Sequence, residues 1–363
     1  MIKNILTVFL IICSNYSFSQ VSATSAKRIN NILYNVLDKT VGQMFTFKKV
    51  SNYIDGSAMN DSKCDHIIFI KYKTEYFKRE YGNKLDIRWF GCDELKNDNQ
   101  IRINKVLATY STAYIPEGIF KISATIVVPE KAELYGEGNK SVIKLMSVRP
   151  VDALSVYRWV TLRNFKLDCS KTDMDLSAAI LVNPWNGIAS TAGELRIKEL
   201  VITGNYPQLQ GVGIKLKIES DKKYPYQIIA FSKFYDIDIY GFRDGISCEL
   251  NYNNSNNISF INANVFDNII IHNCLRPVRI INNANEDQIA AGKSSISSNF
   301  FKNFIVQHVV GEYPAFYIDG GIYNDISGQI VDWTGSYIET SKNSQKNTIK
   351  FTPDNPSKIR ILK

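Results

Sequence analysis

The sequence predicts a parallel β-helix, in which short strands from successive coils stack into long sheets. Three observations support this fold: a recurring apolar triplet, a near-constant interval between triplets, and a second apolar run after each one. Within every triplet the spacing is three and then two positions, and the triplets recur every 32 to 37 residues. They are Leu162, Phe165 and Leu167; Ile197, Leu200 and Ile202; Phe234, Ile237 and Ile239; Phe266, Ile269 and Ile271; Phe301, Phe304 and Val306.

The second apolar runs complete the repeating unit. One short strand cannot bury its apolar side chains alone, but equivalent strands stacked about 4.8 Å apart form a continuous core. An antiparallel sandwich would also give alternation, but it would not readily give five units of near-constant internal spacing. The second runs are Ile180 to Val182, Ile214 to Leu216, Ile246 to Leu250, Val278 to Ile280 and Phe316 to Ile318, with polar loops such as 251–257 and 282–298 between coils.

The first twenty residues have the pattern of an export signal. Lys3 provides a positive n-region, residues 5–13 form an apolar h-region, and Ser17 and Ser19 are small residues before a cleavage point. We expect residues 1–19 to be a signal peptide cleaved before Gln20, and the protein to be secreted, periplasmic or at the cell surface. A lipoprotein signal with Cys13 as the lipidated residue is the alternative, although Ile12 stands where a small residue is wanted.

A small N-terminal region precedes the repeats. The apolar stripe in residues 25–39 predicts a helix, and residues 44–50, 66–72 and 76–81 read as short strands. Residues 99–108 form a second helix-like segment. We therefore expect an N-terminal helix and a small β adaptor over residues 20–84, followed by the β-helix over residues 85–363.

The opening of the second region carries a resemblance. It contains Trp89-Phe90-Gly91, then the helix-like segment, then Tyr114-Ile115-Pro116 with Gly118, and then Leu134-Tyr135-Gly136-Glu137-Gly138. This order resembles the start of the pectate lyase superfamily, which includes phage tailspikes and exported polysaccharide-degrading proteins. The resemblance implies a right-handed, single-stranded parallel β-helix whose open end is capped by the helix, and a homotrimer is common among tailspike-like relatives. The family's Gly-Asp-Gly loop is replaced here by Cys92-Asp93-Glu94-Leu95.

Composition limits the partners and the chemistry. The 363 residues are 45% apolar and 21% charged, and the formal net charge is +8. The 43 Lys and Arg residues are spread along the chain without a basic block, so no nucleic-acid partner is expected, and a basic surface suits an acidic polysaccharide just as well. Past residue 20 no apolar run is long enough to span a membrane. Beyond Cys13, five widely spaced cysteines without a CxxC motif predict neither a disulfide framework nor a zinc site, and we expect small buried hydrophobes.

Stacking the repeats predicts which outward residues meet. The position after each triplet holds Asp168, Thr203, Tyr240, His272 and Gln307, and the outward position two residues earlier holds Lys166, Val201, Asp238, Ile270 and Ile305. Asp238, Tyr240 and His272 are therefore expected within about 5–8 Å of one another. We assign Asp238 and His272 as catalytic candidates and Tyr240 as a sugar-stacking residue.

Further candidates lie beyond the turn after each triplet. Asp244 with Gly245 and Ile246 resembles part of a strand of polygalacturonase-like β-helices in which the aspartate is catalytic, although their Gly-Asp-Asp and Gly-His-Gly motifs are missing here. Asp244 could equally be a turn residue, and the arginines could be solvated charges. The remaining candidates are Arg276 as catalytic, and Arg279, Glu312, Trp333 and His308 as substrate-binding residues.

These observations predict a carbohydrate-active protein that binds an acidic polysaccharide and cleaves it by hydrolysis or β-elimination. The alternative is a non-catalytic glycan-binding or structural tailspike-like β-helix. No cofactor is expected, with calcium at Asp236 and Asp238 as the one alternative. Only three histidines are present, so a multi-histidine metal centre is not expected.

Overall fold

The computed structural model describes residues 21–24, 26–184, 191–219, 226–251, 258–284, 287, 291–309, 313–333, 335–341, 343–352 and 356–361. Contacts divide the chain into two compact units, Met1–Asp93 and Glu94–Lys363. The signal segment predicted for residues 1–19 lies outside the described residues. Within the described part of the chain, no helix has the length and apolar character needed to cross a membrane.

The first unit is built on one antiparallel sheet with the strand order β1-β3-β4-β6-β5, and β2 pairs with β3. Leu33, Val36, Phe47, Ile70 and Phe77 form its apolar core. The strands are β1 (Val21–Ser22), β2 (Lys27–Ile29), β3 (Ile32–Asp38), β4 (Gln43–Lys49), β5 (Phe69–Tyr72) and β6 (Glu75–Arg79), and the short 3-10 helices are η2 (Asp61–Lys63) and η3 (Ile87–Phe90).

The helix predicted for residues 25–39 is wrong, because this stretch forms the hairpin β2–β3. The chain reverses next to Asn30, which adopts a left-handed φ of 53°. A β-bulge between Leu33 and Val36 then turns both side chains into the core, with Asn35 at a φ of 56°. The bulge gives buried residues a spacing of three, and this spacing imitates one face of a helix.

The second unit begins with the capping helix α2 (Gln100–Tyr110), which confirms the helix expected at 99–108. Ile103, Val106 and Leu107 are buried on one face of this helix. The Asn104 side chain accepts a hydrogen bond of 2.9 Å from the backbone N–H of Val127 in the edge strand β9 (Ile126–Val128). The helix therefore covers the open end of the β-helix and satisfies a backbone group that would otherwise be unpaired.

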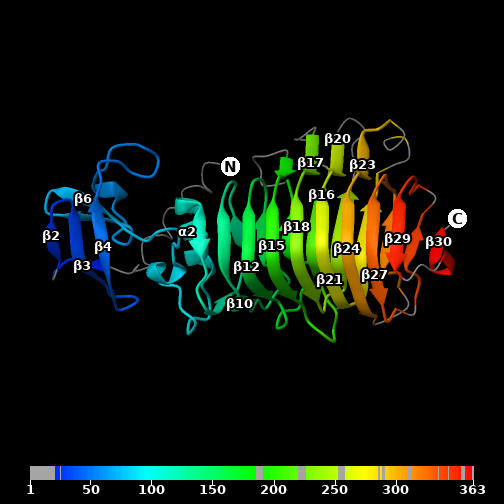
Figure 1. Ribbon diagram of the computed structural model, residues 1–363, viewed down its shortest axis with the longest axis horizontal. Coiled ribbons are helices and arrows are strands. Elements are labelled where there is room, and N and C mark those ends of the chain that lie inside the picture. Colours follow the sequence, from blue (N-terminus) through cyan, green and yellow to red (C-terminus); the bar gives the residue numbers. More distant parts are fainter. Residues whose placement is uncertain are drawn as a thin grey trace. The chain divides into compact units, whose positions relative to one another are not determined.

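Three parallel sheets follow, as a right-handed parallel β-helix requires (Figure 1). The first sheet has neighbouring strands from successive coils, in the order β29-β27-β24-β21-β18-β15-β12-β10-β7, with β8 also paired to β10. Its strands are β7 (Thr112–Tyr114), β8 (Gly118–Ile122), β10 (Glu133–Leu145), β12 (Thr161–Asp168), β15 (Arg196–Thr203), β18 (Lys233–Tyr240), β21 (Val265–Cys274), β24 (Phe300–Val309), β27 (Asp325–Val331) and β29 (Thr348–Thr352).

The second sheet follows the first across a short turn in each coil, and it has the order β30-β28-β25-β22-β19-β16-β13-β11-β9. Besides β9 it contains β11 (Leu154–Val156), β13 (Ala178–Val182), β16 (Val212–Glu219), β19 (Asp244–Asn251), β22 (Arg276–Asn282), β25 (Phe316–Asp319), β28 (Ile338–Thr340) and β30 (Ile359–Ile361), the last preceded by the 3-10 helix η4 (Pro356–Lys358).

A third sheet was not predicted, since parts of it were read as polar loop. It contains β14 (Thr191–Gly193), β17 (Tyr226–Ala230), β20 (Ile258–Asn262), β23 (Ser294–Ser297) and β26 (Gly321–Ile322). Strand β23 lies inside the segment 282–298 that we expected to be a loop. Its sequence, Ser-Ser-Ile-Ser, buries a single large apolar side chain, Ile296, and so gives little apolar signal.

The internal spacing of the triplets has a structural cause. The third residue counted from the first apolar position is left-handed in all five repeats, with φ between 52° and 59° at Asn164, Glu199, Asp236, Asn268 and Asn303. This residue adds one position between the first two inward side chains. The spacing is therefore three across the left-handed residue and two after it. The register confirms that the triplets stack, with Phe234 beside Phe266 and Phe266 beside Phe301 at ring-centroid distances of 4.4 and 4.9 Å.

A buried asparagine ladder closes the turn between the third and first sheets. Asn264, Asn299, Asn324 and Asn347 stack in successive coils, and each side-chain amide donates to the side-chain oxygen of the next at 3.0–3.1 Å. The same oxygens accept the backbone N–H of the preceding asparagine, and the amides also donate to backbone carbonyls such as Ile229 O and Ile261 O. These bonds satisfy buried polar groups and fix the register at the start of the first-sheet strands.

Candidate functional site

The structure brings Asp238 and His272 together on the outer face of the first sheet. Tyr240 pairs in register with His272, and Asp238 is two residues before Tyr240 on β18. His272 Nε2 lies 2.8 Å from Asp238 Oδ1. The side chains remain accessible, with 30% exposure for His272 and 40% for Asp238. The predicted stacking of these outward positions is therefore confirmed by the strand register.

Two tyrosines extend this pair into an aromatic surface. The Tyr240 ring centroid lies 4.9 Å from that of His272 and 5.5 Å from that of Tyr206. Burial and the neighbouring Tyr206 raise the pKa of Tyr240 above its usual value, so its phenol keeps its proton at neutral pH. Tyr206 was missed, because it lies in the loop after β15 and no repeat position points to it. We call Asp238, Tyr240, His272 and Tyr206 the Asp–His–Tyr cluster.

The same outward ladder continues toward the capped end of the β-helix. Lys144 Nζ lies 3.0 Å from Asp168 Oδ2, and Thr203 Oγ1 donates to Asp168 Oδ1 at 3.3 Å. Burial raises the pKa of Asp168, but the bonds from Ser170 and the charge of Lys144 outweigh this effect and leave the pKa below its usual value. Asp168 is therefore an ionised, paired carboxylate three coils away from His272.

Asp244 is fully buried at the start of β19, in the second sheet. Arg276 binds its carboxylate through two bonds of 2.5 and 2.9 Å, and Arg243 Nε lies 3.2 Å from Oδ2. Both carboxylate oxygens are thus occupied by guanidinium groups, which keep 25% and 23% exposure. This geometry is that of an ion-paired anchor for the turn between the first and second sheets.

Arg279 belongs to a separate polar network on the outer face of the second sheet. Arg279 Nη1 and Lys215 Nζ each lie 3.1 Å from the Glu249 carboxylate, and Ser247 Oγ donates to Glu249 at 2.9 Å. Burial alone would raise the pKa of Glu249, but the charges of Lys215 and Arg279 and the bond from Ser247 lower it below 4.5. Lys215 and Glu249 were missed as site residues, because the predicted stacking compared only the outward positions of the first-sheet strands.

This network predicts a pH-dependent stability. Glu249→Gln is expected to lower the free energy of unfolding at neutral pH by about 1–3 kcal/mol, because Lys215 and Arg279 would lose their shared carboxylate. The folded-state pKa of Glu249 is depressed, so its stabilisation is present above the unfolded pKa and is lost as pH falls through the lower folded pKa. The melting temperatures of the parent protein and of Glu249→Gln should therefore converge as the pH falls through that folded-state pKa. A difference that stays constant with pH would contradict the assignment of Glu249 as the shared carboxylate.

The other predicted residues lie apart from the Asp–His–Tyr cluster. Trp333 is only 7% exposed, so its ring faces the protein interior. The backbone of His308 lies in β24, but its side chain is outside the described part of the structure, as is all of Glu312.

The described residues add no support for a metal site or for a reactive thiol. In the described ranges, no group of three or more His, Cys, Asp or Glu side chains is arranged to hold a metal ion. Of the two predicted calcium ligands, Asp236 accepts a bond of 2.6 Å from Asn268, and Asp238 faces His272. The five cysteines of the described chain form no disulfide with one another, and Cys92, Cys169, Cys248 and Cys274 are buried. Burial raises the pKa of Cys274 to about 12, which keeps this thiol protonated.

Comparison with solved structures supports the fold. The enzymatically active domain of tailspike protein 4 from bacteriophage CBA120 is 14% identical, with a TM-score of 0.55, and the match covers 99% of this chain and 54% of that chain. Tailspike protein gp49 from Acinetobacter baumannii bacteriophage Fri1, a capsular polysaccharide depolymerase, is 12% identical with a TM-score of 0.44, covering 94% of this chain and 74% of that chain. The A-module of the mannuronan C-5 epimerase AlgE4 from Azotobacter vinelandii is 12% identical with a TM-score of 0.36, covering 77% and 97%.

The chain spans about half the length of the CBA120 tailspike chains that it matches. No protein-family model matches the sequence, and no curated protein matches it. The expected fold resemblance is confirmed: the protein has the pectate-lyase-like parallel β-helix fold of phage tailspikes.

Proposed function

We propose that the protein binds an acidic polysaccharide and cleaves it by β-elimination at the Asp–His–Tyr cluster. The observation that carries the proposal is the 2.8 Å contact between His272 Nε2 and Asp238 Oδ1, with the Tyr240 ring against the imidazole. A carboxylate can only accept a hydrogen bond, so Asp238 favours the tautomer with the proton on Nε2. The lone pair of His272 Nδ1 is then available as a base.

The reaction needs one base and one acid. His272 Nδ1 takes the proton from the sugar carbon that carries the carboxylate. The electron pair of that C–H bond forms a carbon–carbon double bond as the bond to the linking oxygen breaks. Tyr240, which remains protonated at neutral pH, donates its proton to the departing oxygen. Return of the proton from His272 to Tyr240, directly or through solvent, restores both groups, and no water is consumed.

A positive group must face the substrate carboxylate, since this reaction builds negative charge there. Arg243 follows Tyr240 by three residues, a reach of about 10 Å at most. Arg243 and Arg276 share a single carboxylate, Asp244, so the turn beside the cluster carries a net positive charge. This charge favours a uronate, a sugar bearing a carboxylate, over a neutral sugar.

Hydrolysis fits the cluster less well. Glycoside hydrolysis uses two carboxyl groups flanking the scissile bond. Asp238 is the one carboxylate in the Asp–His–Tyr cluster, and the next along the outward ladder, Asp168, is tied to Lys144. The structural neighbours that act on polysaccharides support polysaccharide as the class of substrate. Those activities belong to the neighbouring proteins and are a proposal for this chain.

The proposal has a direct assay. The protein is incubated with polygalacturonate, alginate, hyaluronan and neutral dextran, and two signals are followed: ultraviolet absorbance of the new double bond and formation of reducing ends. We expect both signals to rise together on at least one uronate polymer and neither to rise on dextran. Reducing ends without absorbance would identify a hydrolase, and binding without either signal would identify a glycan-binding module; each result would overturn the proposed elimination.

We propose that the protein acts outside the cytoplasm. This proposal rests on the sequence of residues 1–19 alone. A homotrimer remains a hypothesis that rests on the resemblance to tailspikes. Neither assignment is needed for the chemistry of the Asp–His–Tyr cluster.

A further inference from the structure

A pocket lies at the opposite end of the first-sheet strands from the Asp–His–Tyr cluster. It has a volume of about 410 Å³ and is formed where β12, β15 and β18 begin. Strand β18 runs from Lys233, in the pocket, to Tyr240, in the cluster, so the two sites are separated by about 23 Å along this strand. Its lining residues include Trp159, Glu194, Arg196, Phe231 and Lys233.

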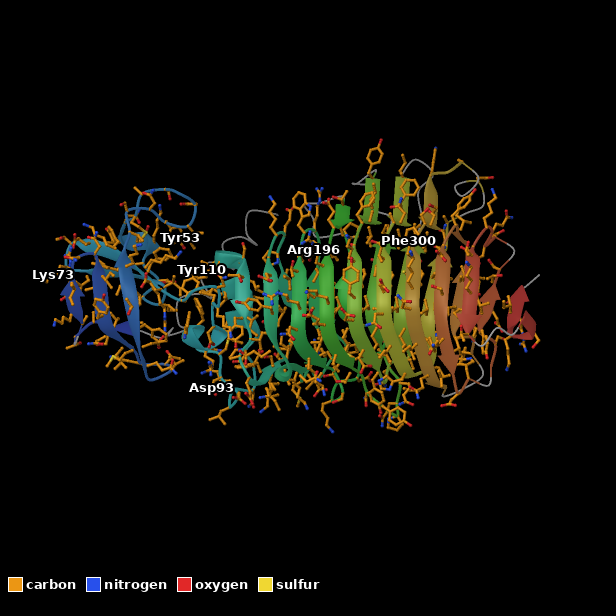
Figure 2. The ribbon with its side chains drawn as sticks, in the orientation of Figure 1. Tyr53, Lys73, Asp93, Tyr110, Arg196 and Phe300 are labelled. Atoms are coloured by element: carbon orange, nitrogen blue, oxygen red, sulfur yellow. The ribbon has the colours of Figure 1, made fainter. Side chains whose placement is uncertain are left out.

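Two cations meet at this pocket without a counter-charge. Arg196 and Lys233 are partners in the register of β15 and β18, and both side chains are exposed. In the part of the chain that the structure describes, neither has an ion-pair partner. Figure 2 labels Arg196 along the edge where Phe300, the first residue of β24, also lies. Like charges on neighbouring strands repel each other, so an anionic ligand between them would be stabilising.

Glu194, the one carboxylate among the described residues that line the pocket, is already engaged. Arg158 Nη2 lies 3.0 Å from Glu194 Oε1. Bonds from the Trp159 side chain and from Arg158 lower the pKa of Glu194, which is therefore ionised and paired at neutral pH. Since the charge of Arg158 compensates that of Glu194, Arg196 and Lys233 make the net charge of the pocket positive.

An exposed aromatic ring adjoins the two cations. Phe231 is 65% exposed, whereas the phenylalanines of the triplets are buried. The Trp159 ring is covered by the Arg158 guanidinium at 3.8 Å and approached by Lys131 Nζ at 4.9 Å. Phe231 makes no ring or cation contact of this kind with any described residue. It thus offers an apolar face of the type that packs against the C–H face of a sugar ring.

We propose that this pocket is a second glycan-binding site, specific for an anionic sugar residue. Arg196 and Lys233 would hold the carboxylate, and Phe231 would stack against the sugar ring. The site shares its class of ligand with the proposed function and takes no part in the elimination. It would anchor an acidic polysaccharide on the same sheet that carries the Asp–His–Tyr cluster.

Calorimetric titration tests the site with the full chain carrying His272→Ala, so that no ligand is consumed. The probes are oligogalacturonate, oligomannuronate and a neutral cello-oligosaccharide of matched length. We expect an anionic oligomer to bind at two sites and the neutral oligomer to bind more weakly. Phe231→Ala, and separately Arg196→Ala with Lys233→Ala, should remove one site or weaken it roughly tenfold or more.

Lys198→Ala is the matched control, because Lys198 is a cation on the same strand that is paired with Glu199. It should bind as the parent protein does, and all variants should keep their melting temperatures. Unchanged binding by the pocket variants, equal binding of the neutral oligomer, or no binding of any anionic oligomer by the parent would overturn the proposal. Loss of the pocket site should leave cleavage of short oligomers by the His272 protein intact, so failure of this site and failure of the proposed function give different results.

Discussion

His272→Ala is expected to lower the rate of uronate polymer cleavage by about 10²–10⁴-fold, the usual contribution of a positioned general base. The imidazole must be unprotonated to accept a proton, so the rate of the parent protein should fall toward acidic pH. The variant lacks this titrating base, and its residual rate should lose that acid limb. Initial rates of double-bond absorbance across a pH series measure both effects.

Gln307→Ala is the matched control for this substitution. Gln307 is the register partner of His272 on β24 and lies outside the Asp–His–Tyr cluster. It should retain the parent rate and pH profile within a few-fold. A His272→Ala protein that keeps both its rate and its acid limb would remove His272 from the mechanism.

Asp244→Asn is expected to lower the free energy of unfolding by about 3–5 kcal/mol, the cost of breaking a buried ion pair by removing one partner. The Asp244 side chain has no solvent exposure, and its oxygens bind Arg276 and Arg243. Loss of the negative charge leaves two guanidinium groups facing each other across a buried amide. Thermal or denaturant unfolding of the purified variant measures the change.

Glu117→Gln gives the same chemical change at an exposed ion pair, where Glu117 is 66% exposed and lies 3.6 Å from Lys140. The exposed variant should stay within about 0.5 kcal/mol of the parent. If Asp244→Asn instead kept its melting temperature and lost all turnover, Asp244 would be a catalytic residue rather than an anchor.

The β-helix was predictable because one physical constraint repeats along the chain. Each coil must bury apolar side chains at equivalent positions, so triplets such as Phe234, Ile237 and Ile239 recur with the same internal spacing. The β-helix was expected to run to residue 363, but no triplet was found in the C-terminal coils, since in β27 Gly328 stands opposite Phe304 and the register shifts there. The hairpin β2–β3 was misread for a related reason, because a bulge at Asn35 gives a strand the spacing of a helix.

The candidate site was predictable only where the register decides it. The meeting of Asp238 with His272 follows from stacking equivalent positions of the triplets. The burial of Asp244 does not follow, because it depends on how the turn folds over its carboxylate. Tyr206 could not be found, since a loop brings it to Tyr240. The pocket at Arg196 was hidden because its residues come from turns and strand starts, which carry no repeat signal.

A double-mutant cycle provides the most direct measurement of whether neighbouring coils build one reactive unit. The rates of double-bond formation are compared for the parent, Asp238→Asn, His272→Ala and the double variant. If Asp238 acts by orienting His272, the double variant should be no slower than His272→Ala alone, because the groups act as a unit. Independent, multiplicative losses from the two substitutions would contradict the account.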